Sequence, residues 1–138
     1  MSLSAIIALG LGVCAGLRVF TPLAALSFFR STWFGVVGVL FVLFEDYMDL
    51  RPSTGPRTAP QSVLLRLASG GFCGWSVTAA NGLTSGIAGA VLGVAGALAG
   101  TYGGYALRIR AIEKFGLIPS GIVEDVIAIA LAAFLVTR

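Results

Sequence analysis

Apolar residues along the chain form five long segments, separated by short stretches that are polar or rich in proline and glycine. The segments span residues 4–29, 32–50, 61–80, 84–107 and 120–137. The second separator, 51–60, holds three prolines and a glycine, and such a composition is typical of a loop. Residues 67–107 carry no charge and are long enough for two membrane crossings at about 20 residues each.

The pattern therefore predicts a polytopic, all-α integral membrane bundle that forms a single domain over 1–138. Five transmembrane helices are expected, because a helix satisfies its own backbone polar groups in lipid whereas an open sheet edge does not. Boundaries fall at Arg30-Ser31, at the 51–60 loop, at Asn81-Gly82 and in a basic loop over 108–119. The lipid bilayer is the first partner that this pattern implies.

Composition supports a membrane environment and excludes several kinds of chemistry. Of the 138 residues, 57% are apolar and 11% are charged, with a mean hydropathy of +0.97; soluble domains carry about 25% charged residues. The chain has no histidine and two cysteines, so a thiol–imidazole metal cluster, a Ser-His-Asp set and a disulfide framework are not expected. The sequence predicts no enzyme, no cofactor and no nucleic-acid partner.

Basic residues in the short loops predict an orientation, because cytoplasmic loops are enriched in Lys and Arg. With five spans, the loops 51–60 and 108–119 lie on the same side as the N-terminus. Six basic residues lie on or beside these loops, against two on the other side: Arg51, Arg57, Arg66, Arg108, Arg110 and Lys114, against Arg30 and Arg138. We expect a bacterial inner-membrane protein with a cytoplasmic N-terminus and an external C-terminus.

The segment 84–107 contains glycines at alternating steps of three and four, which places them in one stripe along a helix face. They are Gly86, Gly89, Gly93, Gly96, Gly100 and Gly103. Such a glycine zipper lets another backbone approach closely in lipid. The partner is either another helix of the same chain or a second subunit, and the stripe is also able to line a substrate groove.

Arg18 lies inside the first apolar segment, four residues before Pro22. A charge at membrane depth is costly, and an arginine beside a proline is typical of an interrupted helix whose freed backbone groups line a site. The alternative is an arginine that locks two helices together or reaches an interface. Straight-helix counting leaves Arg18 without an obvious partner, and direct pairing with an acid needs a tilted or broken first helix.

Charged residues also gather at the ends of other segments, at a common expected depth. The acids and arginines of this set are Glu45, Asp46, Asp49, Glu124, Asp125, Arg57, Arg66 and Arg108. One interpretation is an ion-pair latch that holds loops onto the bundle. A second is an ion or proton gate, and a third is a magnesium–phosphate site, in which carboxylates hold the metal and arginines hold phosphate.

Five stretches of the chain resemble a bacterial membrane family known as domain of unknown function 4126. They are AGLRVFTPLAALS (15–27), RPSTGPRT (51–58), LLRLASGG (64–71), GTYGGYALR (100–108) and GIVEDVIAIAL (121–131). The chain departs from the family pattern at Gly55-Pro56, where a proline-serine pair is expected. The resemblance implies a small multi-helix membrane protein and assigns no reaction.

Three classes of function are compatible with these features. The first is a small transporter or channel for an ion or small solute, acting as a homo-oligomer with the broken helix and the charged residues along its path. The second is a structural or assembly subunit of a larger membrane complex. The third is a lipid-phosphate binding protein or enzyme. The sequence favours the first.

Overall fold

All regular elements of the described chain are helical. The structure is a computed structural model that describes residues 2–49 and 58–138, apart from the side chains of residues 29, 30 and 49. The elements are α1 (Leu3–Leu17), α2 (Thr21–Arg30), α3 (Thr32–Asp49), α4 (Pro60–Thr78), the short 3₁₀ helix η1 (Ala79–Asn81), α5 (Leu83–Phe115) and α6 (Leu117–Val136). The predicted all-α class is confirmed.

Three helical segments of the described chain are long and apolar enough to cross a membrane: 60–81, 83–115 and 117–136. The expected count of five spans is not confirmed. Helix α1 has 15 residues and α2 has 10, so they extend over about 22 and 15 Å, whereas the hydrocarbon core is about 30 Å thick. Helix α3 has 18 residues, but its last turns carry Glu45, Asp46 and Asp49.

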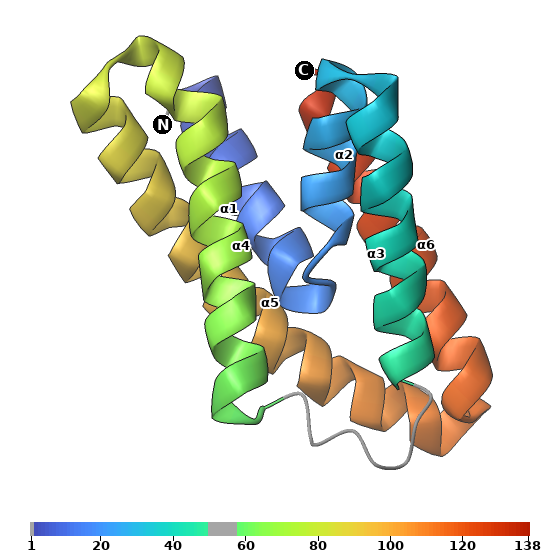
Figure 1. Cartoon of the computed structure of the whole chain (residues 1–138). Helices are drawn as coiled ribbons and strands as arrows, with labels where there is room; N and C mark the ends of the chain where they lie inside the picture. Colours follow the sequence, from blue (N-terminus) through green and yellow to red (C-terminus); the bar gives the residue numbers. More distant parts are fainter. Residues whose placement is uncertain (1, 50–57) are drawn as a thin grey trace.

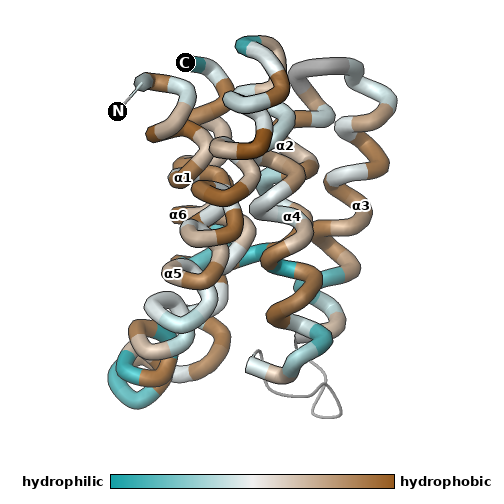
Figure 2. The backbone as a smooth tube through the Cα atoms, turned by 90° about the vertical axis from the view of Figure 1, so that its left-hand side faces the viewer, coloured by the Kyte–Doolittle hydropathy of each residue, from teal (hydrophilic) through white to brown (hydrophobic). Residues whose placement is uncertain are grey.

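The first apolar segment is broken where its sequence predicts a break. Helix α1 ends at Leu17, Arg18 has an extended backbone, and α2 begins at Thr21 with Pro22 in its first turn, where a missing N–H costs no helical hydrogen bond. The chain reverses at this break, so α2 runs back beside α3 rather than continuing α1 (Figure 1). Both termini therefore lie at the same end of the molecule (Figures 1 and 2), which differs from the expected opposite ends.

Helix α5 is longer than the sequence predicts. The basic stretch expected to be a loop over 108–119 continues as helix to Phe115, and α6 already begins at Leu117. Residues 108–115 contain no glycine or proline, so nothing in them stops the helix. Gly116, with φ of 91°, makes the turn between α5 and α6, in a backbone region that essentially only glycine adopts.

Helix α5 lies against both α1 and α4, and its glycines permit this close packing. A methyl group added at Gly93 would collide with the backbone of Gly70 in α4, and one added at Gly12 in α1 would collide with Gly93. A methyl group added at Gly89, Gly96 or Gly100 would likewise collide with atoms of α4 or α1. The glycine stripe thus packs within this chain, as small residues do between membrane helices.

One member of the predicted stripe does not belong to it. Gly103 is exposed, and a methyl group added there would meet nothing within 4 Å, whereas the neighbouring Gly104 is buried. Gly86 belongs to the stripe but faces the ring of Trp75 rather than a backbone. A helix has 3.6 residues per turn, so positions spaced by three or four residues shift gradually around its axis. At this end of the stripe the buried position is Gly104 rather than Gly103.

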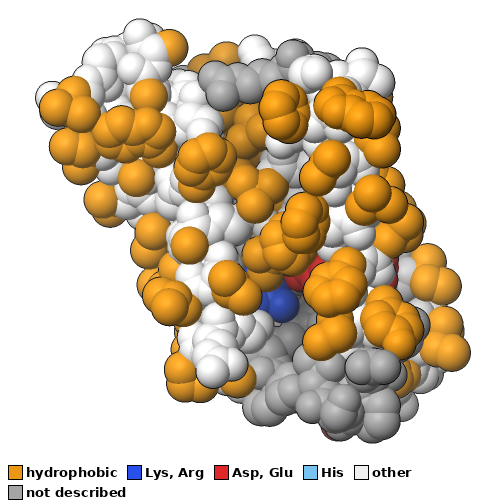
Figure 3. Space-filling model, in the orientation of Figure 1, with side chains coloured by type: hydrophobic (Ala, Val, Ile, Leu, Met, Phe, Trp, Pro, Cys, Tyr) orange, Lys and Arg blue, Asp and Glu red, His pale blue; other side chains and the backbone are white. Residues whose placement is uncertain are grey.

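The surface of the molecule is largely apolar. Trp33 and Leu40 of α3 are 76% and 61% exposed, and Ile122 of α6 is 58% exposed. Hydrophobic side chains are spread over the face shown in Figure 3, and acidic and basic side chains are visible in a small hollow between α4 and α3. Hydrophilic residues gather at the end of α5 (Figure 2). Exposed apolar patches of this extent are typical of a surface that faces lipid.

Candidate functional site: a buried ion-pair cluster at a helix break

The carbonyl groups freed at the end of α1 are satisfied by α4. The guanidinium of Arg66, which is 3% exposed, donates hydrogen bonds from Nη1 to the carbonyl oxygens of Gly16 and of Leu17, the latter at 2.9 Å. The Ser69 hydroxyl, one turn further along α4, donates to the Val19 carbonyl at 2.6 Å. The Arg66 bonds satisfy carbonyls that the last turn of any helix leaves without an intrahelical partner. The Ser69 bond satisfies a carbonyl of the break itself.

Amide groups of the break, just before α2 begins at Thr21, are satisfied by α3. The N–H groups of Val19 and Phe20 donate to the two carboxylate oxygens of Glu45, at 2.8 and 3.1 Å. Glu45 is 8% exposed, so the contact is buried, and a carboxylate at a helix N-terminus is favourable because of the unpaired amides and the helix dipole. Glu45 and Arg66 thus cap the two sides of one break.

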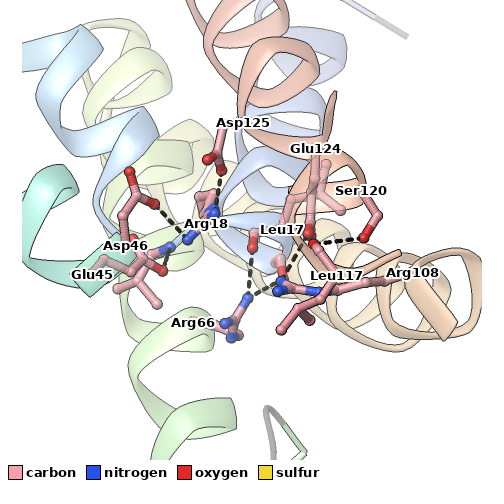
Figure 4. Close-up of polar contacts among 12 residues, drawn as sticks. Leu17, Arg18, Glu45, Asp46, Arg66, Arg108, Leu117, Ser120, Glu124 and Asp125 are labelled. Carbon is pink, nitrogen blue, oxygen red and sulfur yellow. Dashed lines mark hydrogen bonds and ion pairs between the residues drawn. The ribbon is translucent and has the colours of Figure 1, made fainter. Parts of the chain in front are cut away.

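Arg18 joins α3 to α6. Its Nη1 lies 2.7 Å from Asp46 Oδ1, and its Nη2 contacts Asp125 Oδ1. The Arg18 side chain is 4% exposed, whereas those of Asp46 and Asp125 are 33% and 26% exposed. Figure 4 shows the guanidinium between the two carboxylates. We call these three residues the central triad.

A second ion pair lies beside the central triad. Arg108 Nη1 of α5 lies 3.1 Å from Glu124 Oε2 of α6, with side-chain exposures of 12% and 10%. Glu124 and Asp125 are sequence neighbours, yet they bind different arginines (Figure 4). Removing one partner of a buried ion pair costs about 3–5 kcal/mol, because the other charge is then left without compensation.

Seven of the nine charged residues singled out from the sequence lie in this one region. They are Arg18, Glu45, Asp46, Arg66, Arg108, Glu124 and Asp125. The other two are outside the description: Arg57 lies in the segment 50–57, and the side chain of Asp49 is not described. Ser69 was missed, although its position three residues after Arg66 places both on one face of α4.

Two cavities reach the central triad from opposite directions along α6. One, of about 150 Å³, includes Arg18, Asp46, Arg108 and Asp125 in its lining and extends along α6 toward Leu117. The other, of about 360 Å³, lies between α2, α3 and α6 and is lined on α6 by residues 129–133. Asp46 lines both cavities. We call them the α5/α6 cavity and the α2/α3/α6 cavity.

Over the described part of the chain, no group of three or more acidic, cysteine or histidine side chains converges in a way that could hold a metal ion. The carboxylates of the cluster face guanidinium and backbone N–H groups instead. The charged groups of the cluster are thus paired with one another and with backbone groups in largely apolar surroundings. No protein-family model, curated protein or solved structure matches the chain, so the family resemblance stays a prediction.

Proposed function

We propose that this protein is a small membrane transporter or channel for an ion or small solute. One observation carries the proposal: all three residues of the central triad line one cavity, and Asp46 also lines a second cavity further along α6. Charged groups inside a membrane protein commonly mark ion and substrate pathways, and a broken helix at the bilayer midplane commonly provides the binding site of a transporter. A bacterial inner membrane is the proposed location.

Within this proposal, the charged residues divide into two roles. Glu45 and Arg66 bind backbone groups of the helix break, so their role in this proposal is to fix the backbone beside the transport pathway. Arg18, Asp46 and Asp125 contact one another through side chains, and the two acids retain partial exposure. Release of Arg18 from Asp46, with its contact to Asp125 kept, would loosen the link between α3 and α6 and open a path between the two cavities.

Two alternative functions receive less support. An assembly subunit is expected to present its glycine stripe to another chain, but Gly89, Gly93, Gly96 and Gly100 pack against α1 and α4. A lipid-phosphate enzyme that depends on a divalent metal needs a set of converging oxygen ligands, and the described residues offer none.

Reconstitution into liposomes tests the proposal. Protons, Na⁺, K⁺ and tetraphenylphosphonium are offered in turn, and their entry is followed with a trapped dye or by isotope uptake. We expect at least one of them to enter faster than into empty liposomes, and Asp125→Asn to remove that difference. Glu113→Gln is the matched control, since Glu113 is an exposed acid near the end of α5.

Equal entry of all four probes into protein-containing and empty liposomes would contradict the proposal. An accelerated entry that Asp125→Asn leaves unchanged would contradict the assignment of the pathway to the central triad.

A further inference from the structure

The α2/α3/α6 cavity has the dimensions of a small-molecule site. Its volume of about 360 Å³ falls in the range of about 300–1,000 Å³ typical of ligand pockets. Most of its wall is apolar, with Phe28 of α2, Val39 and Leu43 of α3, and Ile129 of α6 among the lining residues. Inorganic cations require several oxygen ligands, so this wall does not suit a bare metal ion.

The polar part of this cavity is anionic. Asp46 and the hydroxyl-bearing Thr21 are the polar side chains of its lining. The contact partner of Asp46 is Arg18, which is shared with Asp125; in the described chain no other cation contacts either carboxylate. Among the described residues, one guanidinium thus contacts two carboxylates. A third of the Asp46 side chain remains exposed, so a further cation would be attracted there.

An apolar wall that leads to a partly compensated carboxylate is complementary to one class of ligand. We propose that the α2/α3/α6 cavity binds a lipophilic organic cation, with its apolar body between α2, α3 and α6 and its charge at Asp46. A lipophilic anion would be repelled by the same carboxylates, and a lipid tail would gain nothing from Asp46. This assignment rests on the proposed transport function, for which it names the substrate class.

Binding of the cation would act directly on the central triad. A ligand cation at Asp46 competes with Arg18 Nη1 for the same carboxylate, while Arg18 keeps its contact with Asp125. Occupation of the cavity would thus weaken the link between α3 and α6 at the point where the two cavities meet. This gives the ligand a way to couple its binding to opening of the path.

Equilibrium dialysis of the purified full chain in detergent tests this inference, with tetraphenylphosphonium as the probe and tetraphenylborate as an anion of matching shape. We expect saturable binding of the cation and at least tenfold weaker binding of the anion. Asp46→Asn should weaken cation binding at least tenfold, and Glu113→Gln should leave it unchanged. Val39→Trp places an indole in the cavity from an exposed position of α3 and should weaken binding even if Asp46→Asn fails to fold.

Three results would overturn the inference: no saturable binding of the cation, equal binding of the cation and the anion, or cation binding that neither variant alters. The liposome flux assay distinguishes failure of this inference from failure of the proposed transport function. Entry of protons, Na⁺ or K⁺ without tetraphenylphosphonium binding would overturn the substrate class and leave transport standing. Binding that depends on Asp46, without entry of any probe, would overturn transport and leave the binding site standing.

Discussion

Glu45 and Asp46 are adjacent acids on α3, yet they make different kinds of contact. Successive side chains of a helix point about 100° apart. Glu45 therefore faces the backbone N–H groups of Val19 and Phe20, whereas Asp46 faces the Arg18 guanidinium. The same division occurs on α6 between Glu124 and Asp125. At the scale of the residue, one acid of each pair therefore belongs to the central triad, and its sequence neighbour binds a different group.

Glu45→Gln is expected to lower the free energy of unfolding, because Glu45 holds the backbone of the helix break. The amide keeps one oxygen acceptor, so one of the two hydrogen bonds to Val19 and Phe20 is lost. A hydrogen bond to a charged group contributes about 1.5–3 kcal/mol, and we expect the free energy of unfolding to fall by about 2 kcal/mol, as measured by SDS titration in mixed micelles. Unchanged stability would show that Glu45 does not cap α2, and Glu113→Gln is the control.

At the scale of the element, α5 depends on its contacts with α1 and α4. Its glycines allow backbone-to-backbone approach on two sides, so the helix is fixed along the part that the stripe covers. Beyond Gly104 it continues to Phe115 and carries Arg108 to Glu124. The position of this ion pair therefore depends on how closely α5 packs at residues more than one helical turn away.

Gly93→Ala and Gly103→Ala form a matched pair on α5. The methyl group at position 93 would collide with the backbone of Gly70, whereas the one at 103 would meet nothing within 4 Å. Overpacking typically costs about 1–3 kcal/mol, while alanine in a helix is favoured over glycine by about 0.5–1 kcal/mol. We expect Gly93→Ala to unfold at a lower SDS concentration than the native chain and Gly103→Ala to unfold at the same or a higher one. The reverse order would contradict the packing.

Gly116→Ala tests the turn between α5 and α6. Gly116 has φ of 91° and ψ of 171°, a region that costs residues other than glycine about 1–3 kcal/mol. Gly121 lies within α6, and an added methyl group there has open space. We therefore expect thermal unfolding, followed by circular dichroism, to occur at a lower temperature for Gly116→Ala and not for Gly121→Ala. Equal effects would mean that the turn does not require glycine.

At the scale of the whole molecule, the reversal at residues 18–20 decides which end each terminus occupies. Helices α1 and α2 form a hairpin that enters and leaves at one end, while the α5–α6 turn lies at the other end (Figure 1). If the two ends of the molecule face opposite sides of a membrane, we expect α1 and α2 to form a re-entrant pair. Irregular backbone at that depth is tolerated where protein groups satisfy it, as Arg66 and Glu45 do here.

Labelling of single cysteines in oriented membrane vesicles checks this arrangement. We expect Ser2→Cys and Thr137→Cys to react with a membrane-impermeant maleimide from the same side, and Glu113→Cys to react from the opposite side. The native chain is the control, because Cys14 and Cys73 are buried. Reaction of Ser2→Cys and Thr137→Cys from opposite sides would contradict the re-entrant hairpin and favour five crossings.

Much of the local structure could be predicted from the sequence. The break at Arg18 and Pro22, the boundary at Ser31 and the turn at Gly82 all occur where they were expected. Local sequence marks these positions: Pro22 and Gly82 restrict or permit the backbone at their own positions, and the polar pair Arg30-Ser31 interrupts the apolar run. The end of α5 was misplaced by eight residues because a basic stretch was interpreted as a loop, although Arg and Lys are good helix formers.

The sequence predicted which charged residues belong to the cluster, but it did not predict which of them pair. Residue type and position within apolar segments singled out Arg18, Glu124 and Asp125, because charges in such segments need partners. The partner of Arg18 could not be predicted, since straight-helix counting places it about 10 Å from Glu45 in depth. The reversal at the break removes that difference, and Arg18 meets Asp46 instead.

The sequence by itself determined that the chain is helical, largely apolar at its surface, and interrupted at Arg18. These properties follow from composition and from local backbone preferences, which act over a few residues. Only the tertiary structure decided that α2 turns back, that the glycine stripe packs inside the chain, and that Arg18 is shared by Asp46 and Asp125. The physical reason is that helices satisfy their own backbone bonds in any arrangement, so their mutual packing depends on contacts between side chains far apart in the sequence.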